Sequence, residues 1–152
     1  MIWRPLAASL CLSACSAPNS ALINQDMITG DSIEQPLVTA AGDPVRGKRL
    51  FVDRDAGHCV LCHQVTGLDA EFQGDIGPDL SLVGARLSPG QLRLRIVDYQ
   101  IVRPGTVMPS YYRIHDLHQV EETHSGAPIL SARDIEDIVA YLERRKDVED
   151  DA

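Results

Sequence analysis

Positive charge, cysteine and long apolar runs are all scarce in this sequence of 152 residues. Lys and Arg number 14 against 22 Asp and Glu, and the formal net charge is −8. Because an acidic chain does not follow a phosphate backbone, we expect no nucleic-acid partner. No run of 18 apolar residues is present, so we expect no permanent transmembrane helix. Four cysteines are too few for a disulfide-stapled scaffold of this length, which is that of one domain.

The N-terminal segment 1–14 has the layout of a secretory signal peptide. It carries one positive charge at Arg4 and no acid, followed by an apolar run over 6–12 and small residues. That run is too short to span a bilayer as a helix, and a frayed N-terminal tail is the alternative. We therefore expect the mature protein to be periplasmic.

The junction LSAC at 12–15 resembles a bacterial lipoprotein box. In proteins with that box the chain is cut before the cysteine, which then carries lipid, so Cys15 is a candidate lipid anchor. Cleavage a few residues later, for example after Ala17, is the alternative, although Pro18 disfavours that site. The first alternative predicts attachment to a membrane, and the second predicts free diffusion.

Three segments follow the signal peptide. Residues 15–41 contain Pro, Asn, Ser, Thr and Gly without a helical period, which predicts a linker or an extended arm over the surface. Residues 42–146 form the predicted folded domain. Residues 147–152 form an acidic tail that we expect to be solvated.

The sharpest motif is CVLCH at 59–63, a C-x-x-C-H sequence. Two thiols at this spacing add across the two vinyl groups of a haem, and the histidine that follows can bind the iron. One helical turn sets both thiols against the edge of the macrocycle. We therefore predict one covalent haem c on Cys59 and Cys62, with His63 as an axial ligand of the iron.

Two other uses of the cysteine pair require features that the sequence does not display. A thioredoxin-like redox motif is expected within a βαβ unit, and none is visible. A zinc site needs about four ligands, usually from a second Cys or His pair at regular spacing. After export only Cys59 and Cys62 remain as closely spaced thiols, so haem attachment is favoured over both.

A six-coordinate haem needs a second axial ligand on the opposite face. The candidate side chains are Met27, Met108, His58, His115, His118 and His124. His58 adjoins Cys59 and cannot wrap to the opposite face, whereas Met108 lies in a Pro/Gly-punctuated segment in which Pro109 keeps it extended. A thioether suits an electron-transfer iron and raises its potential. Met108 is therefore the predicted ligand and His115 the second candidate, while a methionine that fills a core gap is the structural alternative.

The GPDL sequence at 77–80 follows the haem motif by about 15 residues. Alone, its Gly-Pro-Asp start indicates only a turn. A buried ligating imidazole, however, needs an acceptor for its other N–H, and a proline carbonyl in a fixed turn can supply one. Pro78 is therefore the predicted acceptor for His63.

Helix signals dominate the frame around the motif. Asp-Pro at 43–44 predicts a helix to about Val52, and Ser-Pro at 88–89 predicts a second helix through Val97. A capping box at 131–134 precedes an apolar stripe of helical spacing. The stripe consists of Ile135, Ile138, Val139 and Leu142, and the helix is closed by Arg144, Arg145 and Lys146. With weak strand signals throughout, the sequence predicts a small all-α domain.

Aromatic residues are too few to fill a core of this size. Only six remain once Trp3 is removed with the signal peptide. A haem would complete the core, so we expect folding and haem attachment to be coupled.

These elements together resemble class I cytochromes c, in which the first and last helices cross. The resemblance rests on Gly47 and Phe51 in the first helix, the CVLCH motif, GPDL, the methionine loop, and Tyr141 in the last helix. Three blocks are more narrowly similar to SoxX, the monohaem subunit of the SoxXA thiosulfate-oxidising cytochromes. They are IVD at 96–98, TVMPSYYR at 106–113, and GAPILS at 126–131 leading into DIEDIVAYL. The resemblance covers about residues 42 to 146.

The resemblance implies an electron-transfer role with His63 and Met108 as axial ligands. It implies a SoxA-like partner with its own haem and a reactive cysteine, where thiosulfate is joined to a cysteine of the SoxYZ carrier in a thiosulfotransferase reaction. This chain would accept the two released electrons one at a time and pass them to a soluble cytochrome. It has no free thiol for the sulfur chemistry and would be a non-catalytic subunit. A free periplasmic cytochrome c shuttle is the alternative.

Four residues near these motifs have an open role. Tyr111, Tyr112 and Arg113 follow the methionine loop and could hydrogen-bond haem propionates or face a partner. Arg86 has the same two possible roles. Ordinary packing is the alternative for each.

Overall fold

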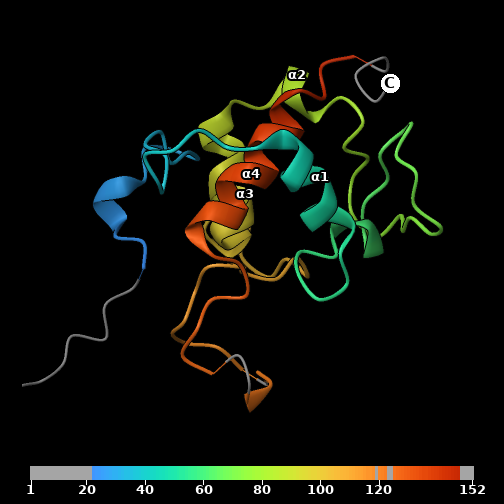
Figure 1. The fold of residues 1–152 in the computed structure, drawn as a ribbon. Helices are drawn as coiled ribbons and strands as arrows, with labels where there is room; N and C mark the ends of the chain where they lie inside the picture. The colour runs from blue at the N-terminus through green and yellow to red at the C-terminus, as the bar shows by residue number, and fades with distance from the viewer. Residues whose placement is uncertain (1–21, 119, 123–124, 148–152) are drawn as a thin grey trace, which may run out of the picture.

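The crossing of the first and last long helices organises the fold (Figure 1). The computed structural model describes residues 22–118, 120–122 and 125–147. Within these residues the elements are η1 (Gln25–Met27), α1 (Pro44–Val52), η2 (Cys59–Leu61), α2 (Val83–Arg86), α3 (Pro89–Val102) and α4 (Ala132–Glu143). The described part contains no β-strand, so the all-α prediction is confirmed. The predicted signal peptide, Cys15, His124 and all but the first residue of the predicted tail lie outside the described residues.

Local signals start the three long helices where the sequence places them. The Asp43 carboxylate caps α1 by accepting the amides of Val45 and Arg46, with Pro44 at the first helical position. Complete capping boxes start α3 and α4, at 88–91 and 131–134. No helix in the described residues is long and apolar enough to cross a membrane.

Two helix ends differ from the prediction. The second helix continues beyond Val97 to Val102, across a break at Asp98. The last helix ends at Glu143, and Arg145 does not lie at its end in solvent. Arg145 is 1% exposed, and its guanidinium donates a hydrogen bond to the carbonyl of Thr66 at 2.7 Å.

Helices α1 and α4 cross at a glycine. A Cβ on Gly47 would lie 1.9 Å from the carbonyl oxygen of Asp137, so only glycine allows this approach. One turn further along, the rings of Phe51 and Tyr141 meet edge to face with centroids 5.5 Å apart. Arg46 forms ion pairs from α1 to acidic residues of α4, including the fully buried Asp137. The crossing therefore combines close backbone contact with buried charge pairing.

Residues 22–41 form an arm that is anchored in the core. Ile33 is fully buried, and its carbonyl accepts a hydrogen bond from the Arg93 guanidinium at 2.6 Å. Arg93 also makes a buried two-point ion pair with Glu136, whose carboxylate accepts the amide of Leu37. Residues 22–41 are therefore packed against α3 and α4 through Ile33 and Leu37.

Helix α4 lies between α1 and α3 (Figure 1). The buried apolar side chains are Ile33, Phe51, Val60, Val65, Leu68, Val83, Leu92, Leu94, Ile96, Val97, Leu130, Ile135, Ile138, Val139, Tyr141 and Leu142. The described residues of the segments 53–82 and 103–131 lie mainly in loops and turns. These two segments carry the candidate site.

Candidate haem site

The cysteine motif forms a single tight turn. His58 adopts a left-handed backbone conformation (φ 44°) and starts η2. The amides of Cys62 and His63 then both donate to the carbonyl of Cys59, at 3.1 and 3.0 Å. The turn is a 3₁₀ turn, tighter than the α-helical turn that the spacing suggests.

The Cys59 thiol lies among protein atoms beside the core. This burial, with a smaller contribution from the neighbouring Cys62, raises the pKa of Cys59 to about 12. The free thiol is therefore neutral at physiological pH, whereas thiol-redox chemistry requires a thiolate. This electrostatic environment does not favour the redox use of the cysteine pair.

His63 is held by backbone groups of the GPDL segment. Its Nδ1 lies 2.8 Å from the carbonyl oxygen of Pro78, so Nδ1–H donates and Nε2 keeps its lone pair for a metal. A Cβ on Gly77 would lie 2.4 to 2.9 Å from three atoms of the imidazole ring. The backbone of Gly77 therefore packs against the ring and restricts its orientation.

The segment after Met108 is tied to the loop that precedes the cysteines. The hydroxyl of Tyr111 donates to the carbonyl of Gly57 at 2.9 Å, and Gly57 lies two residues before Cys59. The amides of Tyr111 and Tyr112 donate to carbonyls of α3. Met108 is half-buried in a loop otherwise largely exposed, and the Tyr111 hydrogen bond ties the residues after this loop to the segment before the thiols.

These groups fit a c-type haem. Two thiols occupy one turn, and an imidazole with a fixed tautomer follows them. A model of the family described as cytochrome c matches residues 44–146. A chain in the crystal structure of SoxXA from P. pantotrophus is similar at 36% identity and a TM-score of 0.73, covering 77% of this chain and 91% of that chain.

The chain belongs to the cytochrome c family, as a SoxX-type cytochrome. It therefore carries covalently bound haem c and functions in electron transfer. Among solved structures, the c-type cytochrome SorU from Sinorhizobium meliloti is also similar, at 20% identity and a TM-score of 0.44, covering 68% of this chain and 90% of that chain. None of the curated proteins matches the sequence.

The sequence left the roles of four residues open. Three of them, Arg113, Arg86 and Tyr111, form an ion pair or a hydrogen bond within this SoxX-type cytochrome. The Arg113 guanidinium lies 3.3 Å from the carboxylate of Asp98, and Arg86 donates to the carbonyl of Asp79 at 2.8 Å. Tyr111 uses its hydroxyl hydrogen on Gly57. These contacts favour packing over propionate binding for the three residues.

Tyr112 is the fourth residue whose role the sequence leaves open. The remaining candidates for the second axial ligand are His115, His118 and Met27. Tyr112 is half-buried against the core. His115 is one-third exposed and its Nδ1 lies 3.0 Å from the Asp116 carboxylate. His118 is exposed, and Met27 belongs to η1 in the arm. None of these contacts ties a second histidine to the CVLCH turn.

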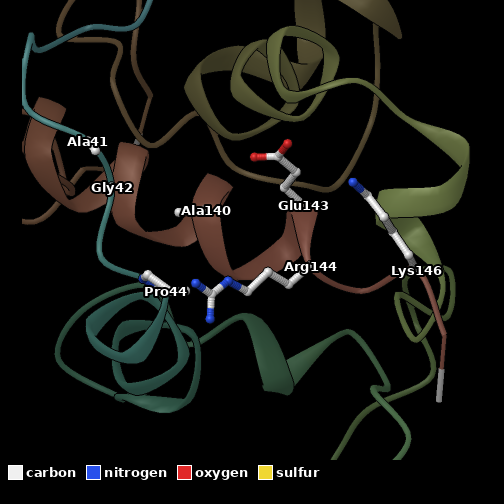
Figure 2. A pocket seen from close by; sticks show the side chains of 7 residues that line it. All are labelled: Ala41, Gly42, Pro44, Ala140, Glu143, Arg144 and Lys146. Atoms are coloured by element: carbon white, nitrogen blue, oxygen red, sulfur yellow. The ribbon is translucent and has the colours of Figure 1, made fainter. Parts of the chain in front are cut away.

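Two surface pockets accompany the site. One, of about 390 Å³, lies between the start of α1 and the end of α4 (Figure 2). It is lined by Ala41, Gly42, Pro44, Ala140, Glu143, Arg144 and Lys146. The other, of about 200 Å³, is lined by Gln64, Val65, Thr66, Gln73 and Asp79. Neither pocket includes the cysteines or His63, so the haem site is recognised by its donor groups and not by a cavity.

Two features of the site escaped the sequence analysis. Gly77 was part of a turn signal, and nothing in a single sequence shows that its backbone touches an imidazole. Asp98 and Ser110 form a buried hydrogen bond of 2.5 Å beside the methionine loop. An acid directly after the apolar pair Ile96-Val97 was the available signal, because buried carboxylates need partners.

Proposed function

We propose that this cytochrome is the electron-transfer subunit of a SoxXA-type thiosulfate-oxidising complex in the periplasm. The similarity over 91% of a SoxXA chain carries the proposal. A SoxA-like subunit with its own haem is the proposed stable partner, and the complex acts on a SoxYZ-type carrier protein.

Each residue of the site has a proposed role. Cys59 and Cys62 would hold the haem through thioether bonds, and His63 and Met108 would bind its iron. Pro78 fixes the imidazole by accepting its Nδ1–H. When bound, the haem supplies a one-electron Fe(III)/Fe(II) couple.

The sulfur chemistry is assigned to the partner. Joining a carrier cysteine thiolate to thiosulfate forms one S–S bond, R–S⁻ + ⁻S–SO₃⁻ → R–S–S–SO₃⁻ + 2e⁻. The two electrons would leave one at a time through this subunit, where His63 and Met108 would hold the haem iron. A separate soluble cytochrome is the proposed acceptor.

Three exposed apolar side chains near the motif are candidates for contact with the haem or with a partner. Leu61, between the two cysteines, is 50% exposed, and Ile76, just before GPDL, is 70% exposed. Val107 in the methionine loop is 83% exposed. Large apolar side chains left in solvent are typical of binding sites when they gather on one surface.

The position relative to the membrane is a separate proposal. If Cys15 carries lipid, the cytochrome is anchored, and Cys15→Ser releases it into the soluble periplasmic fraction. Equal amounts of soluble wild type and variant would reject lipidation at Cys15.

Recovery of the haem-loaded protein from its native periplasm tests the function. Spectra and intact masses of the recovered complex should identify one stoichiometric partner with a second haem, and the complex should be reduced in the presence of thiosulfate and the carrier. A lone red protein that exchanges electrons without a stable partner would overturn the proposal in favour of a free shuttle, whose interface is small.

A further inference from the structure

A buried carboxylate interrupts α3 close to the methionine loop. The backbone of Asp98 leaves helical geometry, at φ −161° and ψ 91°, and its side chain is only 6% exposed. A buried carboxylate is unfavourable unless hydrogen bonds or an opposite charge replace its lost hydration. The groups that bind it therefore indicate what this residue does.

Two of the three partners of Asp98 lie just after Met108. Oδ1 accepts the hydroxyl hydrogen of Ser110 at 2.5 Å and the amide hydrogen of Gln100 at 3.1 Å. Oδ2 lies 3.3 Å from Nη1 of Arg113. Ser110 is itself buried and follows Met108 by two residues. Asp98 thus closes the base of the loop that carries the methionine.

The loop has few means of holding its own shape. Its described hydrogen bonds are local, from the Thr106 amide to the Arg103 carbonyl and from the Met108 amide to the Thr106 hydroxyl, both at 3.2 Å. Gly105 has a positive φ of 80°, and Val107 is 83% exposed. The place of Met108 is therefore determined mainly by how the ends of the loop are fixed.

We propose that Asp98 is a positioning residue for the axial methionine. Through the hydroxyl of Ser110 it sets the distance of the Met108 thioether from the iron, while Arg113 balances the buried charge. The inference rests on the proposed function, because it takes Met108 as the iron ligand. Loosening this tether opens the sixth coordination position to ligands from solution.

The test uses the haem-loaded full chain with Ser110→Ala and Asp98→Asn. Three properties are measured: the red-region absorption of sulfur-ligated ferric haem, the midpoint potential, and the affinity for added imidazole. Ser110→Ala should raise the imidazole affinity about tenfold, since one hydrogen bond to a charged group is lost. Asp98→Asn should raise it further and weaken the red absorption.

A matched control exists in the arm. Ser32 is also buried, and its hydroxyl also donates to a carboxylate, that of Glu34, at 2.5 Å. Ser32→Ala should lower the thermal stability but leave the absorption, potential and imidazole affinity unchanged. If Ser32→Ala changes imidazole affinity as much as Ser110→Ala, general loosening explains the effect and the inference is wrong.

Met108→Ala in the same assays separates the two levels of proposal. If it leaves the red absorption intact, Met108 is not the ligand, and both the ligand assignment and the positioning role fail. If it abolishes that absorption while Ser110→Ala has wild-type imidazole affinity and potential, only the positioning role fails. Ser110→Ala keeps the pair between Asp98 and Arg113, so it decides the question even where Asp98→Asn does not fold.

Discussion

The two axial sides of the candidate haem site are held by different kinds of contact. On the histidine side the backbone positions the ligand: the Pro78 carbonyl lies 2.8 Å from Nδ1 of His63, and the Gly77 backbone packs against the ring. These contacts belong to the path of the chain itself. They persist through most substitutions on neighbouring surfaces.

On the methionine side, side-chain contacts add to the backbone hydrogen bonds from Tyr111 and Tyr112 to α3. The Ser110 hydroxyl binds the Asp98 carboxylate, and the Tyr111 hydroxyl binds the Gly57 carbonyl. Loss of a single oxygen atom removes either contact. The histidine side is therefore set by backbone contacts, whereas side chains also shape the methionine side and allow it to be adjusted one residue at a time.

The variant with the largest expected effect removes the covalent haem, whose iron both axial sides are predicted to bind. Cys59→Ser combined with Cys62→Ser should abolish covalent haem and leave little folded protein, because the sparse aromatic core lacks its largest apolar component. Haem staining and thermal unfolding followed by circular dichroism measure this. Cys15→Ser, the same substitution outside the motif, should keep the haem. A stable apo-domain that unfolds cooperatively would contradict the shared core.

The next variant perturbs the backbone contact on the histidine side. Gly77→Ala places a Cβ 2.4 Å from Cε1 of His63, so the imidazole must move or the chain must shift. We expect a large loss of low-spin, histidine-ligated haem in the absorption spectrum. Gly90→Ala is the control, because its Cβ would meet the Ser32 side chain at 2.3 Å and no haem ligand. Equal spectra for both variants would show that the Gly77 contact does not orient His63.

The methionine side should respond with a change of ligand and no loss of haem. Met108→Ala should abolish the red-region absorption and lower the midpoint potential by on the order of 0.1 V, because a soft thioether favours the reduced iron. Potentiometric titration of the purified cytochrome measures the shift. His115→Ala should leave both properties unchanged. If the two variants exchange these outcomes, His115 is the distal ligand.

The smallest expected effect concerns a surface charge next to Pro78. Hydrogen bonds from Ser81, chiefly from its side chain and then from its amide, lower the pKa of Asp79 below 3.8. A carboxyl with a lowered pKa in the folded state stabilises the protein above pH 3.8, and this contribution is lost as the pH falls further. Asp79→Asn should therefore cost about 1 kcal/mol or less at pH 7, since solvent screens this exposed group.

Chemical denaturation of wild type and Asp79→Asn at pH 7 and near pH 3 measures this contribution. The difference between the two proteins should shrink at the lower pH. A difference that is constant with pH would assign the effect to hydrogen-bond geometry and not to charge.

Signals within a few residues of one another predict the helix starts and the histidine side of the site. The caps at 43–44, 88–91 and 131–134 act within one helical turn, so the sequence alone locates the starts of α1, α3 and α4. The spacing of CVLCH and the fixed carbonyl of Pro78 are also local. These features define the histidine side of the site, which is built from the backbone.

The buried charges were not predictable, because their partners lie far along the chain. Arg145 reaches Thr66 across 79 residues, and Arg93 reaches Glu136 across 43. Nothing in the local sequence distinguishes these from solvated arginines. The same reason explains Arg113, whose role the sequence left open between a propionate, a partner and packing, and which lies beside Asp98.

The buried contact between the arm and the helices determines where the chain can be shortened. The family similarity begins at residue 44, yet Ile33 fills a fully buried position and its carbonyl binds Arg93. A shortened chain that starts at residue 42 would empty that position and remove partners from both Arg93 and Glu136. The core therefore extends to Ile33, and a boundary drawn from the family match at residue 44 would cut through it.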